Sequence, residues 1–171
     1  MSDAEKELAA RVRDIVGAAG MNAEPDNQAY AVDGVTPAVV AMPDSVDQVS
    51  RLLAMASEGG YAVVPRGGGV AMSVGGAPSR VDIVLSTARL AKVIDYSPDD
   101  MTITAQAGAT LATLASLMSG HGQMLPVDPP LPERSTVGGV LAANASGPLR
   151  YQFGTPRDLA VTPLHMARFV A

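Results

Sequence analysis

The stretch AVVAMPDSVDQVSRLLAMASEGGYAVVPRGGG, residues 38–69, decides the fold. It opens with a short apolar run that reads as a buried strand and stops at Pro43. A helix then begins at Ser45, where Ser45 and Gln48 have the spacing of a capping box. Two glycines end that helix, and residues 61–64 read as the next strand. Strand, helix and strand with short joints predict a βαβ unit, with parallel strands and helices on the sheet.

The flanking sequence predicts further elements on both sides of this unit. Residues 2–19 have the apolar spacing of a helix, for which Gly20 suits the exit. Residues 81–85 read as a third strand, and residues 91–96 and 101–105 read as a hairpin joined by a tight turn. We expect a helix after Thr110, which can cap it, and we expect the glycine-rich residues 120–122 to end that helix.

Composition narrows the function classes. The chain has 171 residues, of which 47% are hydrophobic and 17% charged, so a buried core is expected; its 17 glycines and 13 prolines belong in loops. The absence of cysteine excludes disulfides, iron–sulfur clusters and thiol nucleophiles. A net charge of −5 with scattered basic residues argues against nucleic acid as a partner. His121 reads as a surface residue, and two histidines give no metal site.

The location follows from what the chain lacks. Its first residues are acidic where a signal peptide needs a basic patch and an apolar run. Residues 101–127 contain no Asp, Glu, Lys or Arg, but their Thr, Gln and Gly content fits a buried strand and helix, not a membrane span. We therefore predict a cytoplasmic protein with no integral membrane segment.

A first glycine-rich segment, residues 63–76, follows the second strand directly. Three consecutive glycines allow close approach of the backbone, and successive N–H groups in such a loop can form a nest for phosphate oxygens. Arg66 can add positive charge or point away. The Walker pattern is absent, and the dinucleotide pattern G-x-G-x-x-G fails because Met72 stands where its last glycine belongs. The glycines alone are equally compatible with a flexible surface turn.

A second small-residue segment covers residues 135–147. Residues 136–143 predict a short helix in which two adjacent glycines each cost roughly 1 kcal/mol relative to alanine. That cost is tolerable where something must pack against bare backbone. A free helix N-terminus at residues 135–137 would also offer N–H groups to an anion. Two such surfaces in one domain fit an elongated ligand that carries a diphosphate.

With these segments in order, the chain resembles the FAD-binding, PCMH-type domain of the vanillyl-alcohol oxidase and PCMH flavoprotein superfamily. Within it the chain is most similar to the glycolate oxidase FAD-binding subunit and the D-2-hydroxy-acid dehydrogenases. The motifs that carry the resemblance are Pro65-Arg-Gly-Gly-Gly69, Gln106-Ala-Gly108, Gly122-Gln-Met-Leu-Pro126, Asp128-Pro-Pro130, Ser135-Thr-Val-Gly-Gly-Val-Leu-Ala-Ala-Asn144, Gly147-Pro148 and Tyr151-Gln-Phe-Gly-Thr-Pro-Arg-Asp158.

The resemblance implies an α+β or α/β fold: a βαβ subdomain followed by a mixed-sheet subdomain that is truncated here. It implies that residues 1–35 form an N-terminal helix and connection, and that residues 36–171 form the FAD-binding domain. It also implies the FAD contacts, on the loop for the diphosphate and on later segments for the rest of the cofactor: Arg66, Gly67, Gly68, Gly69, Val70, Ala71, Met72, Pro126, Asp128, Thr136, Gly138, Gly139, Asn144 and Gly147.

Some relatives attach FAD covalently through a histidine just after the loop glycines, or through a cysteine. Val70 occupies the histidine position and the chain has no cysteine, so non-covalent FAD is predicted. Val70 also lacks the hydroxyl that many relatives carry nearby, for which Ser73 is a substitute.

The end of the chain departs from the family pattern. After Asp158 the family continues into a strand, an α/β stretch and a substrate domain, whereas here Pro163 would interrupt a central strand. A truncated piece and a natural short form both explain this ending. On either explanation the flavin-ring and substrate regions are missing, so we predict no catalytic residue, and His165 is a poor candidate for one.

The leading hypothesis is the FAD-binding portion of a flavin-dependent oxidoreductase that acts on a small 2-hydroxy acid, of the glycolate or D-lactate type, with companion oxidoreductase subunits. Two alternatives remain open from the sequence. One is a degenerate flavin-fold module that binds no cofactor and pairs with a partner subunit. The other is a nucleotide-sugar binder of related fold, which would prefer a uridine diphosphate conjugate.

Overall fold

The computed structural model describes residues 2–23, 27–156 and 167–170. The chain divides into two compact units. Unit 1 contains Met1–Arg66 and Met72–Arg89, and unit 2 contains Gly67–Ala71 and Leu90–Ala171. The loop Gly67–Ala71 therefore belongs to unit 2, although the residues before and after it in the glycine-rich segment belong to unit 1.

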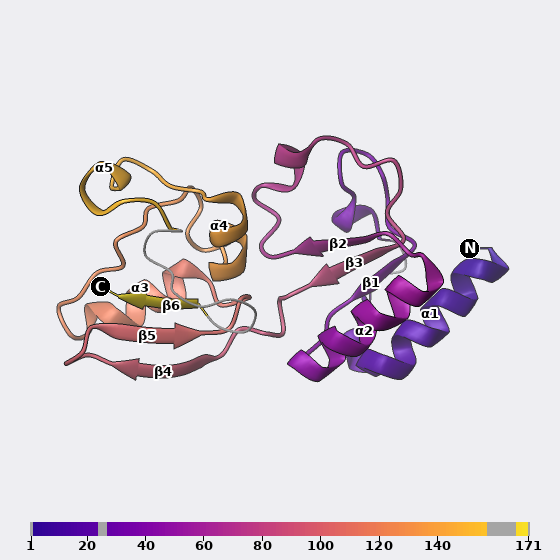
Figure 1. Cartoon of the computed structure of the whole chain (residues 1–171), viewed down its shortest axis with the longest axis horizontal. Coiled ribbons are helices and arrows are strands. Elements are labelled where there is room, and N and C mark those ends of the chain that lie inside the picture. Colours follow the sequence, from indigo (N-terminus) through magenta and orange to yellow (C-terminus); the bar gives the residue numbers. More distant parts are fainter. Residues whose placement is uncertain (1, 24–26, 157–166, 171) are drawn as a thin grey trace. The chain divides into compact units, whose positions relative to one another are not determined.

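Unit 1 is built on a parallel sheet of three strands in the order β1-β3-β2 (Figure 1). These are β1 (Val39–Ala41), β2 (Val63–Arg66) and β3 (Ile83–Ser86), and both outer strands pair with β3 in parallel. The predicted βαβ unit is confirmed. The third strand of the sequence lies between the first two, so the sheet places a fully buried strand at its centre.

Both faces of this sheet are covered, which explains why its strands are apolar runs without alternation. Helices α1 (Asp3–Val16) and α2 (Val46–Gly59) cover one face. The opposite face packs against a connection that includes the 3-10 helix η2 (Gln28–Tyr30). The first core consists of Leu8, Val12, Val16, Val39, Ala41, Leu52, Met55, Ala56, Ile83 and Leu85, and the second of Val32, Val40, Val81 and Val84.

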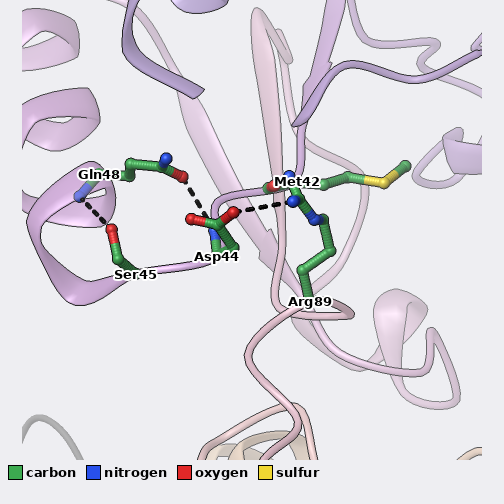
Figure 2. Close-up of polar contacts among 5 residues, drawn as sticks. All are labelled: Met42, Asp44, Ser45, Gln48 and Arg89. Carbon is green, nitrogen blue, oxygen red and sulfur yellow. Dashed lines mark hydrogen bonds and ion pairs between the residues drawn. The ribbon is translucent and has the colours of Figure 1, made fainter. Parts of the chain in front are cut away.

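The start of α2 has the cap that the sequence predicts, with one change of partner (Figure 2). The Ser45 hydroxyl accepts a hydrogen bond from the Gln48 N–H at 3.2 Å. The Gln48 side chain accepts from the N–H of Asp44, not from that of Ser45, at 2.9 Å. Arg89 donates to the Asp44 carboxylate at 2.8 Å and to the Met42 carbonyl at 3.3 Å, so the chain after β3 is tied to the start of α2.

Helix α1 ends earlier than predicted. Its C-cap is Gly17, with φ of +72°, and a 3-10 helix η1 (Ala18–Gly20) follows it. At the other end Ser2 and Glu5 form a complete capping box. None of the helices in the described part of the chain is long and apolar enough to cross a membrane.

Unit 2 contains an antiparallel sheet in the order β4-β5-β6 (Figure 1). Strands β4 (Val93–Ser97) and β5 (Thr102–Ala105) form the predicted hairpin. Strand β6 (Ala167–Val170) pairs with β5, although no strand was expected after Asp158. Pro163 and His165 lie outside the described residues.

One buried cluster joins the two longer helices of unit 2 to β5. Helix α3 (Leu111–Ser119) begins after the Thr110 cap and ends at Gly120, as predicted. Helix α4 (Val137–Ala143) is the predicted short helix, and α5 (Arg150–Phe153) follows it. The remaining short helix, the 3-10 helix η3 (Met72–Gly75), is part of unit 1 and not of unit 2. The buried cluster consists of Ile103, Ala105, Ala109, Leu111, Leu114, Met118, Leu125, Val127, Val137 and Val140.

The α2 cap gives a first prediction. Replacing Ser45 by alanine removes the acceptor of the Gln48 N–H, so we expect the free energy of unfolding to fall by about 1 kcal/mol. The matched control is Ser50→Ala, at an exposed position inside the same helix, where alanine is the better helix former and stability should stay equal or rise slightly. Urea unfolding followed by circular dichroism measures both. Equal losses in the two variants would contradict a specific role for the cap.

Candidate functional site

The two glycine-rich segments meet inside unit 2. A Cβ on Gly68 would overlap with the backbone carbonyl of Arg134, and a Cβ on Gly67 would overlap with the Thr136 hydroxyl. The Arg134 side chain also donates to the Gly68 carbonyl at 3.2 Å. The loop and the segment before α4 are therefore in direct backbone contact, and only glycine permits it. We had expected these glycines to admit a ligand, whereas at Gly67 and Gly68 they admit the protein's own chain.

The same loop leaves its backbone donors open. Among the described residues, the N–H groups of the five loop residues donate no hydrogen bond: Gly67, Gly68, Gly69, Val70 and Ala71. Gly69 has a φ of +71°, the left-handed conformation in which neighbouring N–H groups can turn toward one concavity. Buried or half-buried N–H groups are normally paired, so a run of open donors marks a place where a ligand with acceptor atoms can bind.

Arg66, which we predicted as a cofactor contact, points its side chain elsewhere. Its guanidinium donates to the Ala29 carbonyl at 2.9 Å and lies over the Tyr30 ring, 4.4 Å from the ring centroid. Met72, at the other end of the predicted contact segment, packs into the second core of unit 1. Val70 is 36% exposed. The open part of the loop is therefore Gly67–Ala71.

The start of α4 does not offer free donors. The Val137 N–H donates to Ala109 at 2.9 Å and the Gly138 N–H to Ala107 at 2.8 Å, while the Gly139 N–H donates to the Thr136 hydroxyl at 3.3 Å. We expected the N–H groups of residues 135–137 to be free for an anion, and this is wrong for Val137 and also for Ser135, whose N–H donates to the Leu131 carbonyl at 2.8 Å. The Val137 and Gly138 donors are occupied because the start of α4 pairs with the chain that leads into α3, and the Gly139 donor is occupied by the helix cap.

Another segment of the chain packs directly against the backbone of Gly138, the situation in which a glycine inside a helix is tolerable. A Cβ on Gly138 would lie 2.9 Å from the Ala107 Cβ and 3.0 Å from the Ala107 carbonyl oxygen. Ala107 stands in the Gln106-Ala-Gly108 motif but was not among the predicted site residues. The sequence signal that could have identified it is a small residue inside this motif.

Asp128 organises the far end of the segment. Its two carboxylate oxygens accept from the N–H groups of Gly147, at 2.9 Å, and Leu149, at 3.1 Å. A Cβ on Gly147 would lie 2.5 Å from the Asp128 carbonyl oxygen. Pro126 is buried and Asp128 half-buried. Asp128 thus holds the chain after α4 in place, which is a positioning role.

Asn144 carries an unpaired buried atom. It caps α4 in the left-handed conformation, with φ of +48° and ψ of +40°. Its side-chain oxygen Oδ1 is buried and has no hydrogen-bond partner among the residues that the structure describes. A buried acceptor without a partner is costly, so this oxygen is positioned for a donor that the described residues do not supply.

Two sets of groups suited to one ligand thus occur in unit 2. The Gly67–Ala71 loop supplies open N–H donors, and Asn144 supplies an open acceptor. Arg134, which we did not predict, brings a guanidinium to the loop. No cluster of three or more His, Asp or Glu that could hold a metal ion occurs in the described ranges. The donor set suits phosphate oxygens, and the acceptor suits a hydroxyl or N–H group.

The chain is similar in sequence to known proteins. Residues 37–162, well over half of the chain, match the family described as FAD binding domain. D-2-hydroxyglutarate dehydrogenase of Xanthomonas citri pv. viticola is 34% identical over 71% of this chain and 26% of its own length. D-lactate dehydrogenase of Archaeoglobus fulgidus is 33% identical over 81% of this chain and 33% of its own length.

Two further similarities agree with these. Glycolate oxidase subunit GlcD of Bacillus subtilis is 29% identical over 77% of this chain and 29% of its own length. A solved alkyldihydroxyacetonephosphate synthase superposes with a TM-score of 0.65 at 30% identity, over 74% of this chain and 26% of that one. The chain spans between 26% and 33% of the length of these relatives.

The contact between Gly138 and Ala107 predicts that Gly138→Ala lowers stability, the opposite of what helix propensity alone predicts. Helix propensity alone says that Gly138→Ala should stabilise by roughly 1 kcal/mol. The contact says that the new methyl forces α4 away from Ala107, and we expect a net loss of about 1–3 kcal/mol instead.

The control is Gly120→Ala, in the same unit. Gly120 has a φ of −62° and its nearest neighbour would lie at an ordinary 3.5 Å, so this variant should be neutral or slightly stabilised. Thermal unfolding of both variants measures the difference. A Gly138→Ala protein as stable as Gly120→Ala would show that the helix has room at Ala107.

Proposed function

Because the chain belongs to the FAD binding domain family, we propose that it is the cofactor-binding portion of a flavin-dependent oxidoreductase that holds FAD non-covalently. The observation that carries the proposal is the run of open N–H donors on Gly67–Ala71, held against the segment before α4. A diphosphate has the acceptor oxygens that these donors lack. We propose residues 36–171 as the extent of the cofactor-binding domain.

The residues fit this cofactor in two respects. Backbone amides in a nest bind anionic oxygens without needing a side-chain charge, which suits a loop whose nearest predicted cation, Arg66, contacts Ala29 and Tyr30. The Asn144 Oδ1 can accept from a hydroxyl or N–H group elsewhere on an elongated ligand. FAD carries both kinds of group, acidic phosphates and neutral donors.

The other predicted contacts act by shaping the site. Thr136 caps α4, and the lack of a side chain at Gly138 allows close packing against Ala107. The Asp128 carboxylate accepts a hydrogen bond from the Gly147 N–H. Gly139 donates its N–H to Thr136, and Pro126 is buried beside the Asp128 segment. In the proposed complex these residues fix the path of the backbone, while the loop amides and Asn144 make the direct contacts.

The reaction class follows from the relatives. The three relatives are named for D-2-hydroxyglutarate, D-lactate and glycolate, which share a hydroxyl group on the carbon beside a carboxylate. Bound FAD supplies the acceptor for a hydride equivalent from such a carbon. This chain's own residues bind and orient the cofactor, and we assign no catalytic group among them. We propose a small 2-hydroxy acid as the substrate of the whole protein.

Companion subunits and a cytoplasmic location complete the proposal. The glycolate oxidase relative is named as a subunit, which supports assembly with other chains. The chain contains no cysteine, as expected for a protein that needs no disulfides in a reducing compartment.

FAD titration tests the central proposal. We expect the wild-type chain to bind FAD and Gly68→Ala to lose most of that affinity, because a Cβ at this position displaces the loop from Arg134. Gly120→Ala is the matched control and should bind like wild type. Flavin fluorescence measures binding, and circular dichroism confirms that each variant is folded. A wild-type dissociation constant for FAD larger than about 1 mM would contradict the proposal.

Non-covalent attachment is tested separately. Precipitating the FAD-loaded chain with acid should leave all flavin absorbance in the supernatant, because Val70 stands at the position of the attaching histidine and the chain has no cysteine. Intact-mass spectrometry of the pellet should give the mass of the bare polypeptide. A yellow pellet whose mass is increased by one flavin would contradict this.

A further inference from the structure

Arg134 lies at the glycine loop on a tightly folded support. The preceding turn is closed by hydrogen bonds from the N–H groups of Arg134 and Ser135 to the Leu131 carbonyl, at 2.9 and 2.8 Å. Leu131 is left-handed, with φ of +52°, and the buried Ser135 hydroxyl donates to the Pro130 carbonyl at 2.7 Å. This turn holds the Arg134 backbone against Gly68.

The Arg134 guanidinium reaches the same residue that its carbonyl contacts. One of its nitrogens donates to the Gly68 carbonyl at 3.2 Å. A guanidinium has five N–H donors in a planar fork, so most of them remain available. The bond orients this fork beside the loop whose N–H groups are open.

Arg134 differs from three other arginines of the chain in its ion pairing. Arg89 pairs with Asp44, Arg80 with Asp82 and Arg51 with Asp47. Arg134 forms no ion pair with a carboxylate in the part of the chain that the structure describes. An uncompensated, exposed guanidinium at a loop of open amides is an arrangement that attracts phosphate, because the planar fork matches two phosphate oxygens.

We propose that Arg134 is a cofactor-binding residue whose guanidinium binds the same diphosphate as the N–H groups of Gly67–Ala71. This assignment rests on the proposed function and names the cation of that site. The sequence offered Arg66 as a possible source of positive charge and left open that its side chain points away, as it does here. Arg134 has a second effect on the loop, since its bond to the Gly68 carbonyl orients that peptide.

The experiment separates the charge from loop support by using ligands with and without phosphate. FAD, ADP and adenosine are titrated against wild type, Arg134→Gln and Arg134→Lys, at low and high salt. We expect Arg134→Gln to bind FAD and ADP about tenfold more weakly, the loss of a charge-assisted hydrogen bond, and to bind adenosine as wild type does. Arg134→Lys should recover part of the loss, because it keeps the charge but not the fork.

The charge-matched control is Lys92→Gln, an exposed position in the same unit that removes one positive charge elsewhere. It should leave all three affinities unchanged. The salt dependence of FAD binding should be shallower for Arg134→Gln than for wild type, since salt screens the contact that the variant lacks.

The outcomes distinguish the two levels of the proposal. A wild-type chain that binds neither FAD nor ADP contradicts the proposed function, and the Arg134 assignment with it. Wild-type binding of FAD together with unchanged affinities in Arg134→Gln contradicts only the assignment. Equal weakening of FAD, ADP and adenosine overturns the charge role, because it leaves Arg134 as a support for the loop.

Discussion

The contact of bare backbone between Gly67–Gly68 and the Arg134–Thr136 segment is the constraint on which the candidate site depends. Side chains at either glycine would overlap with a carbonyl or a hydroxyl that is itself fixed. The Arg134 carbonyl is held by a closed turn, and Thr136 is held as the cap of α4. Because hydrogen bonds hold both partners, their contact with Gly67 and Gly68 restricts where the loop backbone can lie. Pre-organised donors of this kind bind a ligand without a further ordering cost.

Much of the fold followed from local patterns. The parallel βαβ unit, the hairpin and the caps at Ser45 and Thr110 each depend on residues close together in the chain, and the structure contains them. The position of β3 between β1 and β2 and the pairing of β6 with β5 did not follow from local patterns. Strand order is set by which apolar faces can be covered, and no short stretch of sequence specifies that.

The site was predictable in its segments but not in its contacts. The glycine loop, the Asp128 segment and the α4 glycines were all identified from their composition and order. Which arginine serves the loop was not, because Arg66 and Arg134 look alike in sequence and differ only in their neighbours, Tyr30 for one and Gly68 for the other. The Val137 N–H was likewise expected to be free, because its acceptor, the Ala109 carbonyl, lies in a distant segment of the chain.

The contact between the loop and Arg134 also sets an order in time. The two partners of the Arg134–Gly68 hydrogen bond are separated by 66 residues of chain. During synthesis at about 5–20 residues per second, the glycine loop would therefore leave the ribosome roughly 3–13 s before its support exists. The strands and helices of unit 1 are complete by Arg89, whereas the loop is part of unit 2. The Gly67–Ala71 loop therefore gains its contact with Arg134 only after all residues of unit 1 have been synthesised.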